Sequence, residues 1–351
     1  MPASNESKLS WLKRYPLLGP LFGLVFVLLL FEAMVYAHFH TNFLTPDTIG
    51  LIVLQTTVVA TGTLGMTLII VAGGIDLSAG SLVALAGVSA AVVLHNGHSS
   101  WLAVLVALGV GALVGLVNGF IIARFDLMPF IVTLGMMSTA RGLAKWVGNN
   151  QTVNYNLKST EGVNGLMNNP NTIYDATIPH LDKVYTDGVA QMVPSHAHEV
   201  SHWLFGLLSH IFRADPDQAG ALFVPLWVPT YGVLIVVALT ILMSLVLNRS
   251  VFGRHVFALG SNEATARLCG LHTMWLKIGV YTLGGLFVGL AGVFSLARLN
   301  QGDVTAGTGM ELDSITAVVI GGASLNGGVG SIGGAVIGAL TMTSLHSCCV
   351  E

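Results

Sequence analysis

The sequence predicts an all-α polytopic membrane protein with about eight transmembrane helices and a re-entrant segment. Of its 351 residues, 53% are hydrophobic and only 9% are charged, whereas soluble domains carry about 25% charged residues. Several apolar runs approach or exceed the roughly 20 residues that cross a bilayer. Within these runs small residues recur at helical spacing, as at Gly111, Gly115 and Gly119, and in lipid such residues let helices pack closely.

The predicted spans are separated by short polar connections. In chain order they are residues 17–38, 48–72, 79–95, 101–123, 129–147, 223–247, 275–297 and 330–346. The first run is too long for the apolar part of a signal peptide, so we expect it to remain as a span. A further apolar piece, 314–322, is too short to cross. It is predicted to be a re-entrant or broken helix, which is tolerated only where protein or a cavity surrounds it.

The distribution of basic residues predicts the orientation. Lys8, Lys13 and Arg14 precede the first span and favour a cytosolic N-terminus. Three cations near predicted outer ends depart mildly from this rule, namely Arg141, Lys145 and Arg298. Strict alternation then gives an N-terminal transmembrane half, an external polar loop and a C-terminal transmembrane half, at residues 1–147, 148–222 and 223–351.

Within the second half, residues 258–281 form a polar island between two apolar runs. Ser261 or Asn262 can cap a helix, Glu263 suits its first turn and Arg267 its last, and Gly270 can end it. A helix of about two turns is unstable alone. It therefore needs the flanking spans to hold it, and its exposed face is then free for a partner. The alternative is an ordinary capped helix in a loop.

Three stretches carry a resemblance to a known family. They are Phe252–Gly270, which holds FGR, GSNEA and ARLCG, then Gly73–Ser81 (GGIDLSAGS), and Ala306–Asp313 (AGTGMELD) running on to Gly322. Their order and content resemble the permease subunits of ribose/xylose-type ABC sugar importers. The resemblance covers most of residues 45–148 and 223–345.

The resemblance implies a membrane-spanning permease subunit of an ATP-driven importer for a simple sugar such as a pentose or hexose. It implies a coupling helix at 261–270, with the ATPase-coupling residues Gly260, Ser261, Asn262, Glu263, Ala264, Arg267, Leu268 and Gly270. It implies partners as well: ABC ATPase subunits, an external sugar-binding protein and a second permease copy, in a bacterial-type inner membrane. No nucleic-acid partner is expected. A channel without an ATPase is an alternative, but it would leave the coupling helix without a purpose.

The sequence contains no G-x-x-x-x-G-K-[ST] phosphate cradle. ATP is therefore expected on separate subunits, and this chain is expected to hold no cofactor and to catalyse no reaction.

Polar residues within or beside spans are candidates for the translocation path. These are Gln55, Asp76, Ser78, Asn118, Thr308, Glu311 and Asp313. Acids inside a membrane are costly and usually face a cavity or a partner, and interrupted helices mark transport sites. Each has a structural alternative. Asp76 can satisfy the backbone of a helix break, the acids near residue 311 can stabilise a helix start, and the amides can join neighbouring helices.

One motif favours a different class of protein. His198-Glu199-Val200-Ser201-His202 matches the H-E-x-x-H pattern, with His196 nearby. On a helix, two such histidines bind zinc and the glutamate acts as a base, so a membrane-bound metalloprotease is the alternative function. The motif lies in the external loop, away from any predicted scaffold, and we expect no metal site there.

Two departures from the family are expected. The loop at 148–222 is much longer than the connection that the family has at this place. The family also continues with about one more span after Leu345, whereas this sequence ends at Glu351. Either the sequence is a fragment, or its last span is missing.

Overall fold

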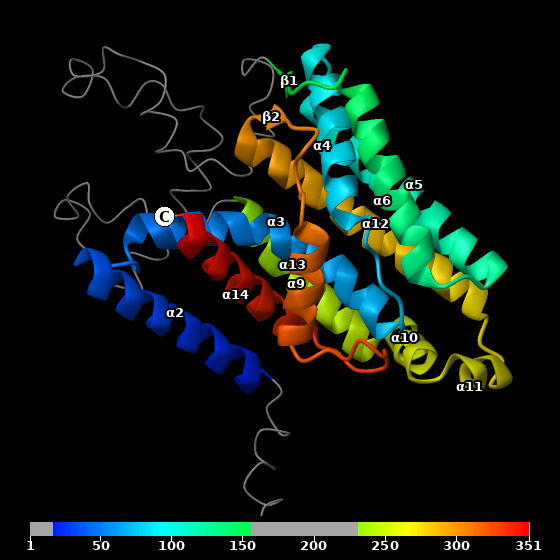
Figure 1. The fold of residues 1–351 in the computed structure, drawn as a ribbon. Coiled ribbons are helices and arrows are strands. Elements are labelled where there is room, and N and C mark those ends of the chain that lie inside the picture. Colours follow the sequence, from blue (N-terminus) through cyan, green and yellow to red (C-terminus); the bar gives the residue numbers. More distant parts are fainter. Residues whose placement is uncertain (1–16, 156–230, 351) are drawn as a thin grey trace, which may run out of the picture. The chain divides into compact units, whose positions relative to one another are not determined.

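The computed structural model describes residues 17–155 and 231–350, which form α-helices and one short pair of strands (Figure 1). The helices are α2 (Leu18–Phe39), α3 (Pro46–Val71), α4 (Ala79–His95), α5 (Ser100–Phe125), α6 (Pro129–Val147), α9 (Tyr231–Arg249), α10 (Val251–Ser261), α11 (Glu263–Leu268), α12 (Thr273–Leu299), α13 (Met310–Ile320) and α14 (Ile332–Val350). Strands β1 (Val153–Asn154) and β2 (Gln301–Gly302) pair antiparallel.

These helices confirm the predicted fold class. Each of the eight predicted spans overlaps one described helix, and residues 223–230 of the sixth lie outside the described residues. The short run at 314–322 falls mainly within α13. Five described helices are long and apolar enough to cross a membrane by themselves, namely α2, α3, α5, α9 and α12. The apolar stretches of α4 and α14, Ala79–His95 and Ile332–Cys348, are shorter than those of the five, and α6 carries Arg141 and Lys145.

Helix α12 lies at the centre of the bundle. In its most apolar stretch 78% of the residues are buried, against 11% in α2. It packs most extensively against α5, and the glycines of both helices allow close approach. A Cβ atom placed on Gly111 would lie 2.8 Å from the Cα of Gly289, so these two backbones touch. The small residues predicted to promote packing do so here.

Two breaks interrupt the helical path. The first break (residues 72–78) separates α3 from α4, and the second break (residues 303–309) separates β2 from α13. The turn between α13 and α14 (residues 321–331) lies close to the first break, because the backbone N–H of Gly328 donates to the Val71 carbonyl at 2.9 Å.

Four of the described helices end in the same way. After α3, α4, α11 and α13 a glycine takes a left-handed conformation, with φ of +84° at Gly73, +78° at Gly97, +84° at Gly270 and +90° at Gly322. In each case the N–H of the residue after the glycine donates to a carbonyl five residues earlier, as from Gly74 to Ile69 at 2.8 Å. This pattern satisfies carbonyls that the helix end leaves free. The predicted role of Gly270 as a helix end is thus observed.

The connections gather at two ends of the bundle. At one end the strands meet the last turn of α4, where His95 Nδ1 lies 2.7 Å from the Asn154 carbonyl oxygen. At the other end Lys277, near the start of α12, reaches both Glu263 on α11 and Asp126 after α5. We call this second end the coupling end. The segments around 148–155 and 250–273 therefore lie at opposite ends, as the predicted alternation requires.

Candidate functional site: a coupling surface and a polar cavity

The helix predicted at residues 261–270 is shorter in the structure, and another helix ends directly before it. Helix α10 runs to Ser261, and α11 covers only Glu263–Leu268. Between them Asn262 is extended, with φ −163° and ψ 102°, and its Oδ1 accepts a hydrogen bond from the Thr265 N–H at 2.9 Å. Of the two residues proposed as the cap, Asn262 is the one that acts. The extended residue redirects the chain, which is why one continuous helix does not form.

Helix α11 is held against the bundle by one buried side chain and a set of ion pairs. Ala266 is 4% exposed and faces inward. Glu263 Oε1 lies 3.0 Å from Arg267 Nη2 and 2.7 Å from Lys277 Nζ. The predicted four-residue pair of Glu263 and Arg267 is thus present. Ion pairs this exposed are worth about 0–1 kcal/mol each, so they orient the helix more than they stabilise it.

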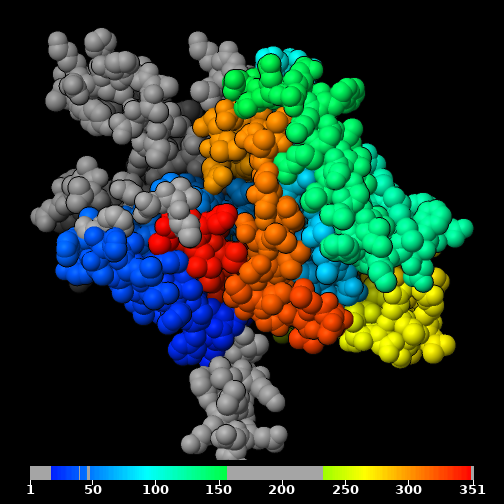
Figure 2. All heavy atoms as spheres, in the orientation of Figure 1, coloured from blue at the N-terminus to red at the C-terminus, as the bar shows by residue number. Residues whose placement is uncertain are grey.

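The opposite face of α11 is open. Leu268 is 88% exposed, and with Ala264 it lines a shallow hollow completed by Asp126, Glu263 and Arg267. We call these five residues the coupling surface. Figure 2 shows the yellow atoms of residues 250–270 on the outside of the molecule. An exposed leucine amid charged side chains on a short, externally held helix is the arrangement expected of a docking element.

Four of the eight predicted coupling residues do not line this hollow. Gly260 and Ser261 do not line the hollow. They pack against the end of α3 and the turn between α13 and α14, since a Cβ placed on Gly260 would lie 2.6 Å from the Gly328 nitrogen. Asn262 and Gly270 shape the two ends of α11 and do not line the hollow either.

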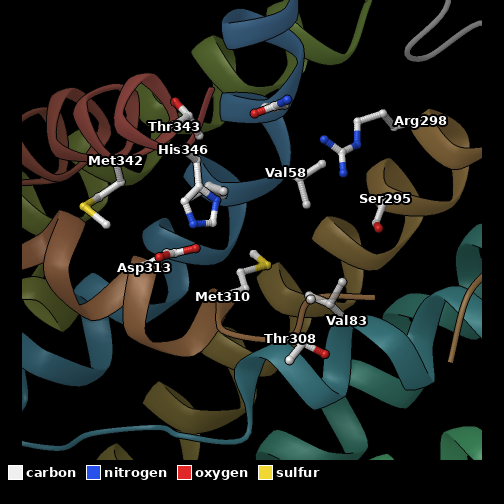
Figure 3. Close-up of a pocket in the computed structure, with 13 residues that line it drawn as sticks. Val58, Val83, Ser295, Arg298, Thr308, Met310, Asp313, Met342, Thr343 and His346 are labelled. Carbon is white, nitrogen blue, oxygen red and sulfur yellow. The ribbon is translucent and has the colours of Figure 1, made fainter. Parts of the chain in front are cut away.

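A polar cavity of about 170 Å³ lies among α3, α4, α12, α13 and α14 (Figure 3). Three predicted path residues line it, namely Gln55, Thr308 and Asp313. The rest of its lining is Val58, Val59, Val83, Ser295, Arg298, Gly307, Met310, Met342, Thr343 and His346. In Figure 3 Arg298 and Ser295 lie on one side, and Asp313 and His346 lie on the other, with Met310 between them.

The charged side chains of the cavity are open to a ligand. In the described part of the chain, Arg298 makes no hydrogen bond or ion pair. Asp313 is near enough to His346 to interact electrostatically, but it has no hydrogen bond within the same residues. Gln55 Oε1 accepts from Ser347 Oγ at 3.3 Å, and Thr343 Oγ1 lies 2.5 Å from Thr56 Oγ1. The cavity thus presents a cation and an acid on facing walls, with hydroxyl and amide groups between them.

Sequence reasoning missed Arg298, His346, Ser295 and Thr343 as cavity residues. Arg298 was noted only as a departure from the charge rule. The five helices that supply the lining are far apart in the sequence, so no spacing along the chain connects these residues. A basic residue near the outer end of a predicted span was the one available signal.

Three other predicted path residues form a separate buried cluster. Asp76 is 2% exposed, and its Oδ1 accepts from both the N–H and the hydroxyl of Ser78, at 2.8 and 2.6 Å. Asn118 Nδ2 donates to the same hydroxyl at 3.1 Å. Ser78 stands at the N-cap position of α4 without capping it, because its hydroxyl is used by Asp76. This cluster braces the first break and does not line the cavity.

The last predicted path residue, Glu311, lies in the first turn of α13 beside Gly80. Its Oε2 is buried without a hydrogen-bond partner in the part of the chain that the structure describes. Nearby, Arg141 Nη1 donates to the carbonyls of Val304 and Ala306, at 3.0 and 2.9 Å, and so anchors the second break. This role for Arg141 was not predicted from the sequence.

The residues of the H-E-x-x-H motif, His198 to His202, lie outside the described residues. Within residues 17–155 and 231–350 no group of three His, Cys, Asp or Glu side chains could hold a metal ion.

The helical fold, the broken helices and the exposed short helix define a membrane transport protein. Residues 48–350 match the family described as branched-chain amino acid transport system / permease component. The chain belongs to this family of transport permeases. No solved structure matches it.

Among curated proteins the chain is similar to sugar import permeases. It is 35% identical over 306 residues to the ribose import permease protein of Escherichia coli (strain K12), covering 87% of this chain and 78% of that protein. It is 34% identical to the fructose import permease protein of Rhizobium meliloti, covering 93% and 76%. It is 30% identical to the L-arabinose ABC transporter permease protein of Azospirillum brasilense, covering 87% and 73%.

Proposed function

We propose that this chain is the membrane-spanning permease subunit of an ATP-driven importer for a simple sugar. The coupling surface is the observation that carries the proposal, because α11 is a short helix held at one end of the bundle with its apolar and charged face open. Separate ATPase subunits would bind that face. The relatives named as ribose, fructose and arabinose permeases support a monosaccharide as the cargo.

The complete importer would contain further copies and partners. Two permease chains would pair, two ATPase subunits would grip the two copies of α11, and an external binding protein would deliver the sugar. This assembly requires the coupling end to be cytosolic, with the N-terminus on the same side and residues 148–222 outside. Residues 1–147 and 223–351 would then be the two transmembrane halves around that external loop.

The polar cavity is proposed as part of the sugar path. A cavity of about 150 Å³ admits a six-membered ring in a well-studied engineered protein, and this cavity measures about 170 Å³. The cavity is therefore on the scale of a single small ring. Arg298 and Asp313 together carry no net charge, and amide and hydroxyl groups lie between them. Such a lining suits a neutral ligand with many hydroxyl groups.

Reconstitution tests this proposal. The permease would be expressed with a candidate ABC ATPase and a candidate sugar-binding protein and placed in liposomes. We expect uptake of radiolabelled ribose, fructose or arabinose that depends on ATP and on the binding protein. Equal uptake without ATP would instead favour a channel, and peptidase activity abolished by chelators would favour the metalloprotease.

A further inference from the structure

Three backbone segments meet at the end of α10, just before α11 begins. They are the end of α3 with the start of the first break, the end of α10, and the turn between α13 and α14. One hydrogen bond joins two of them, since the Gly328 N–H donates to the Val71 carbonyl at 2.9 Å. We call the meeting point of Gly73, Gly260, Gly327 and Gly328 the glycine junction.

At the glycine junction backbones touch with no side chain between them. A Cβ atom on Gly327 would lie 2.8 Å from the Gly73 Cα and 2.7 Å from the Gly260 oxygen. A Cβ atom on Gly328 would lie 2.9 Å from the Ser261 Cα. Distances under about 3 Å leave no room for any residue larger than glycine unless the segments separate. Direct backbone contact has no flexible side chain that could absorb a displacement, so it passes motion on efficiently.

The position of the junction connects the two candidate sites. Ser261 ends α10 and is followed by Asn262, which caps α11. On the other side, the helices that enter the junction also supply residues of the cavity lining. Gln55 comes from α3, Asp313 from α13 and Thr343 from α14. A shift of α10 and α11 at the coupling end would therefore move α3 and the α13–α14 pair together.

A second connection, between α11 and α12, transmits movement less directly than the glycine junction. Helix α11 also reaches α12 through the ion pair of Glu263 with Lys277, at 2.7 Å. Glu263 is 35% exposed in its side chain, and both side chains are long and rotatable. An ion pair of this kind can follow a moving helix without moving its neighbour.

We infer that Gly260, Gly327 and Gly328 are positioning residues for transport, because they pass the movement of the coupling helix to the cavity walls through backbone contact. This inference rests on the proposed function. It predicts a class of variant in which the ATPase still binds and hydrolyses ATP but the sugar path no longer responds.

The turn between α13 and α14 provides a matched pair of variants. Gly327→Ala adds a Cβ atom against the junction at a residue with φ +83°. Gly322→Ala adds the same atom in the same turn at φ +90°, where nothing lies within 4 Å. Both variants carry similar backbone strain, so a difference between them reports the contact alone. A second pair avoids this strain: Gly260→Ala against Gly279→Ala, both within helices, of which the second has open space around it.

Each variant would be co-purified with its ATPase, checked by size-exclusion chromatography and assayed in liposomes for ATP hydrolysis and uptake of ribose, fructose and arabinose. We expect Gly327→Ala to keep ATPase binding and basal hydrolysis, to lose stimulation of hydrolysis by the sugar-loaded binding protein, and to lose uptake by about ten-fold or more. Gly322→Ala should stay near wild type. If Gly327→Ala does not fold, the Gly260→Ala and Gly279→Ala pair gives the same comparison.

Two outcomes would overturn the inference. Normal stimulated hydrolysis and uptake in both Gly327→Ala and Gly260→Ala would show that the contact is not needed. Equal losses in each variant and its control would show that strain or added bulk alone is responsible. In both cases the wild-type importer still works, so the proposed function survives. Failure of the wild-type permease to bind an ATPase would instead overturn the proposed function and the inference together.

Discussion

The two helix breaks share a local motif and differ in their surroundings. In the first break Asp76 Oδ1 accepts from the N–H and hydroxyl of Ser78, and in the second Asp303 Oδ1 accepts from the N–H and hydroxyl of Thr305, with all four distances between 2.6 and 2.8 Å. Asp76 is 2% exposed, whereas Asp303 is half-buried and Thr305 is exposed. The same turn is therefore a buried brace in one break and a surface feature in the other.

What surrounds each break explains the difference. Tyr281 Oη and Thr133 Oγ1 both lie 3.4 Å from the Ile75 carbonyl oxygen, so the first break is enclosed by neighbouring helices. The second break is held from one side by Arg141 and opens onto the polar cavity through Thr308. An acid next to a helix break is thus evidence of function only when its hydrogen bonds are not already made within the protein.

The largest effect is expected at Asp76. Asp76→Ala removes the acceptor for two donors of Ser78 in a buried site, and an unsatisfied buried donor costs about 1–3 kcal/mol. We expect a lower melting temperature and little folded protein in the membrane, measured by fluorescence-detected size exclusion during heating. Asp76→Asn keeps an acceptor oxygen and should lose much less. Equal stability of Asp76→Ala and wild type would mean that the first break is not braced by this cluster.

A smaller effect is expected at Arg141. Arg141→Met would keep the bulk of the side chain but remove the bonds to the Val304 and Ala306 carbonyls. Hydrogen bonds to charged groups contribute about 1.5–3 kcal/mol, so the second break should loosen while the bundle still folds. Uptake in liposomes should fall, and Arg141→Lys should restore part of it. Unchanged uptake in Arg141→Met would contradict the role of Arg141 as an anchor.

Asp313 should affect transport and leave folding almost intact. Asp313→Asn keeps the shape of the side chain but removes the charge facing the cavity. A charge-assisted hydrogen bond to a sugar hydroxyl is worth roughly 1–2 kcal/mol more than a neutral one, so the KM for uptake should rise about ten-fold. The melting temperature should stay within error of wild type. A large loss of stability with an unchanged KM would make Asp313 a structural residue like Asp76.

The smallest effect is expected at Asp303. Asp303→Ala removes the same two hydrogen bonds as Asp76→Ala, but at an exposed turn where water replaces them. We expect stability and uptake close to wild type in the assays used for Asp76. A loss as large as that of Asp76→Ala would contradict the conclusion that the two breaks differ in how much their hydrogen bonds stabilise the protein.

The sequence predicted the helices well because apolar length and composition identify membrane helices directly. It predicted the cap at Asn262 and the helix end at Gly270 because these depend on a few adjacent residues. It missed α10 as a separate helix, although Val256 and Leu259 are buried at helical spacing. That stretch was interpreted only through its resemblance to a family.

The cavity and the glycine junction could not be predicted in the same way. Arg298, Asp313 and His346 come from three helices that meet only in the folded chain. Likewise, the glycines at 73, 260 and 327 are ordinary helix-end or loop residues in the sequence. Their close approach depends on how α3, α10 and the turn between α13 and α14 pack.

Ala264→Asp tests most directly whether the coupling surface binds the ATPase. Ala264 lines the exposed hollow of α11 beside the acids Asp126 and Glu263, and the cation of the hollow, Arg267, is already paired with Glu263. A further carboxylate buried there against a partner would therefore cost about 3–5 kcal/mol. Thr265→Asp is the control, because it adds the same charge to the same helix at an exposed position outside the hollow. The measurement is the amount of ATPase that co-purifies with each folded, membrane-inserted permease. Our account predicts that Ala264→Asp loses the ATPase and sugar uptake while Thr265→Asp keeps both. Normal ATPase binding and uptake by Ala264→Asp would contradict it.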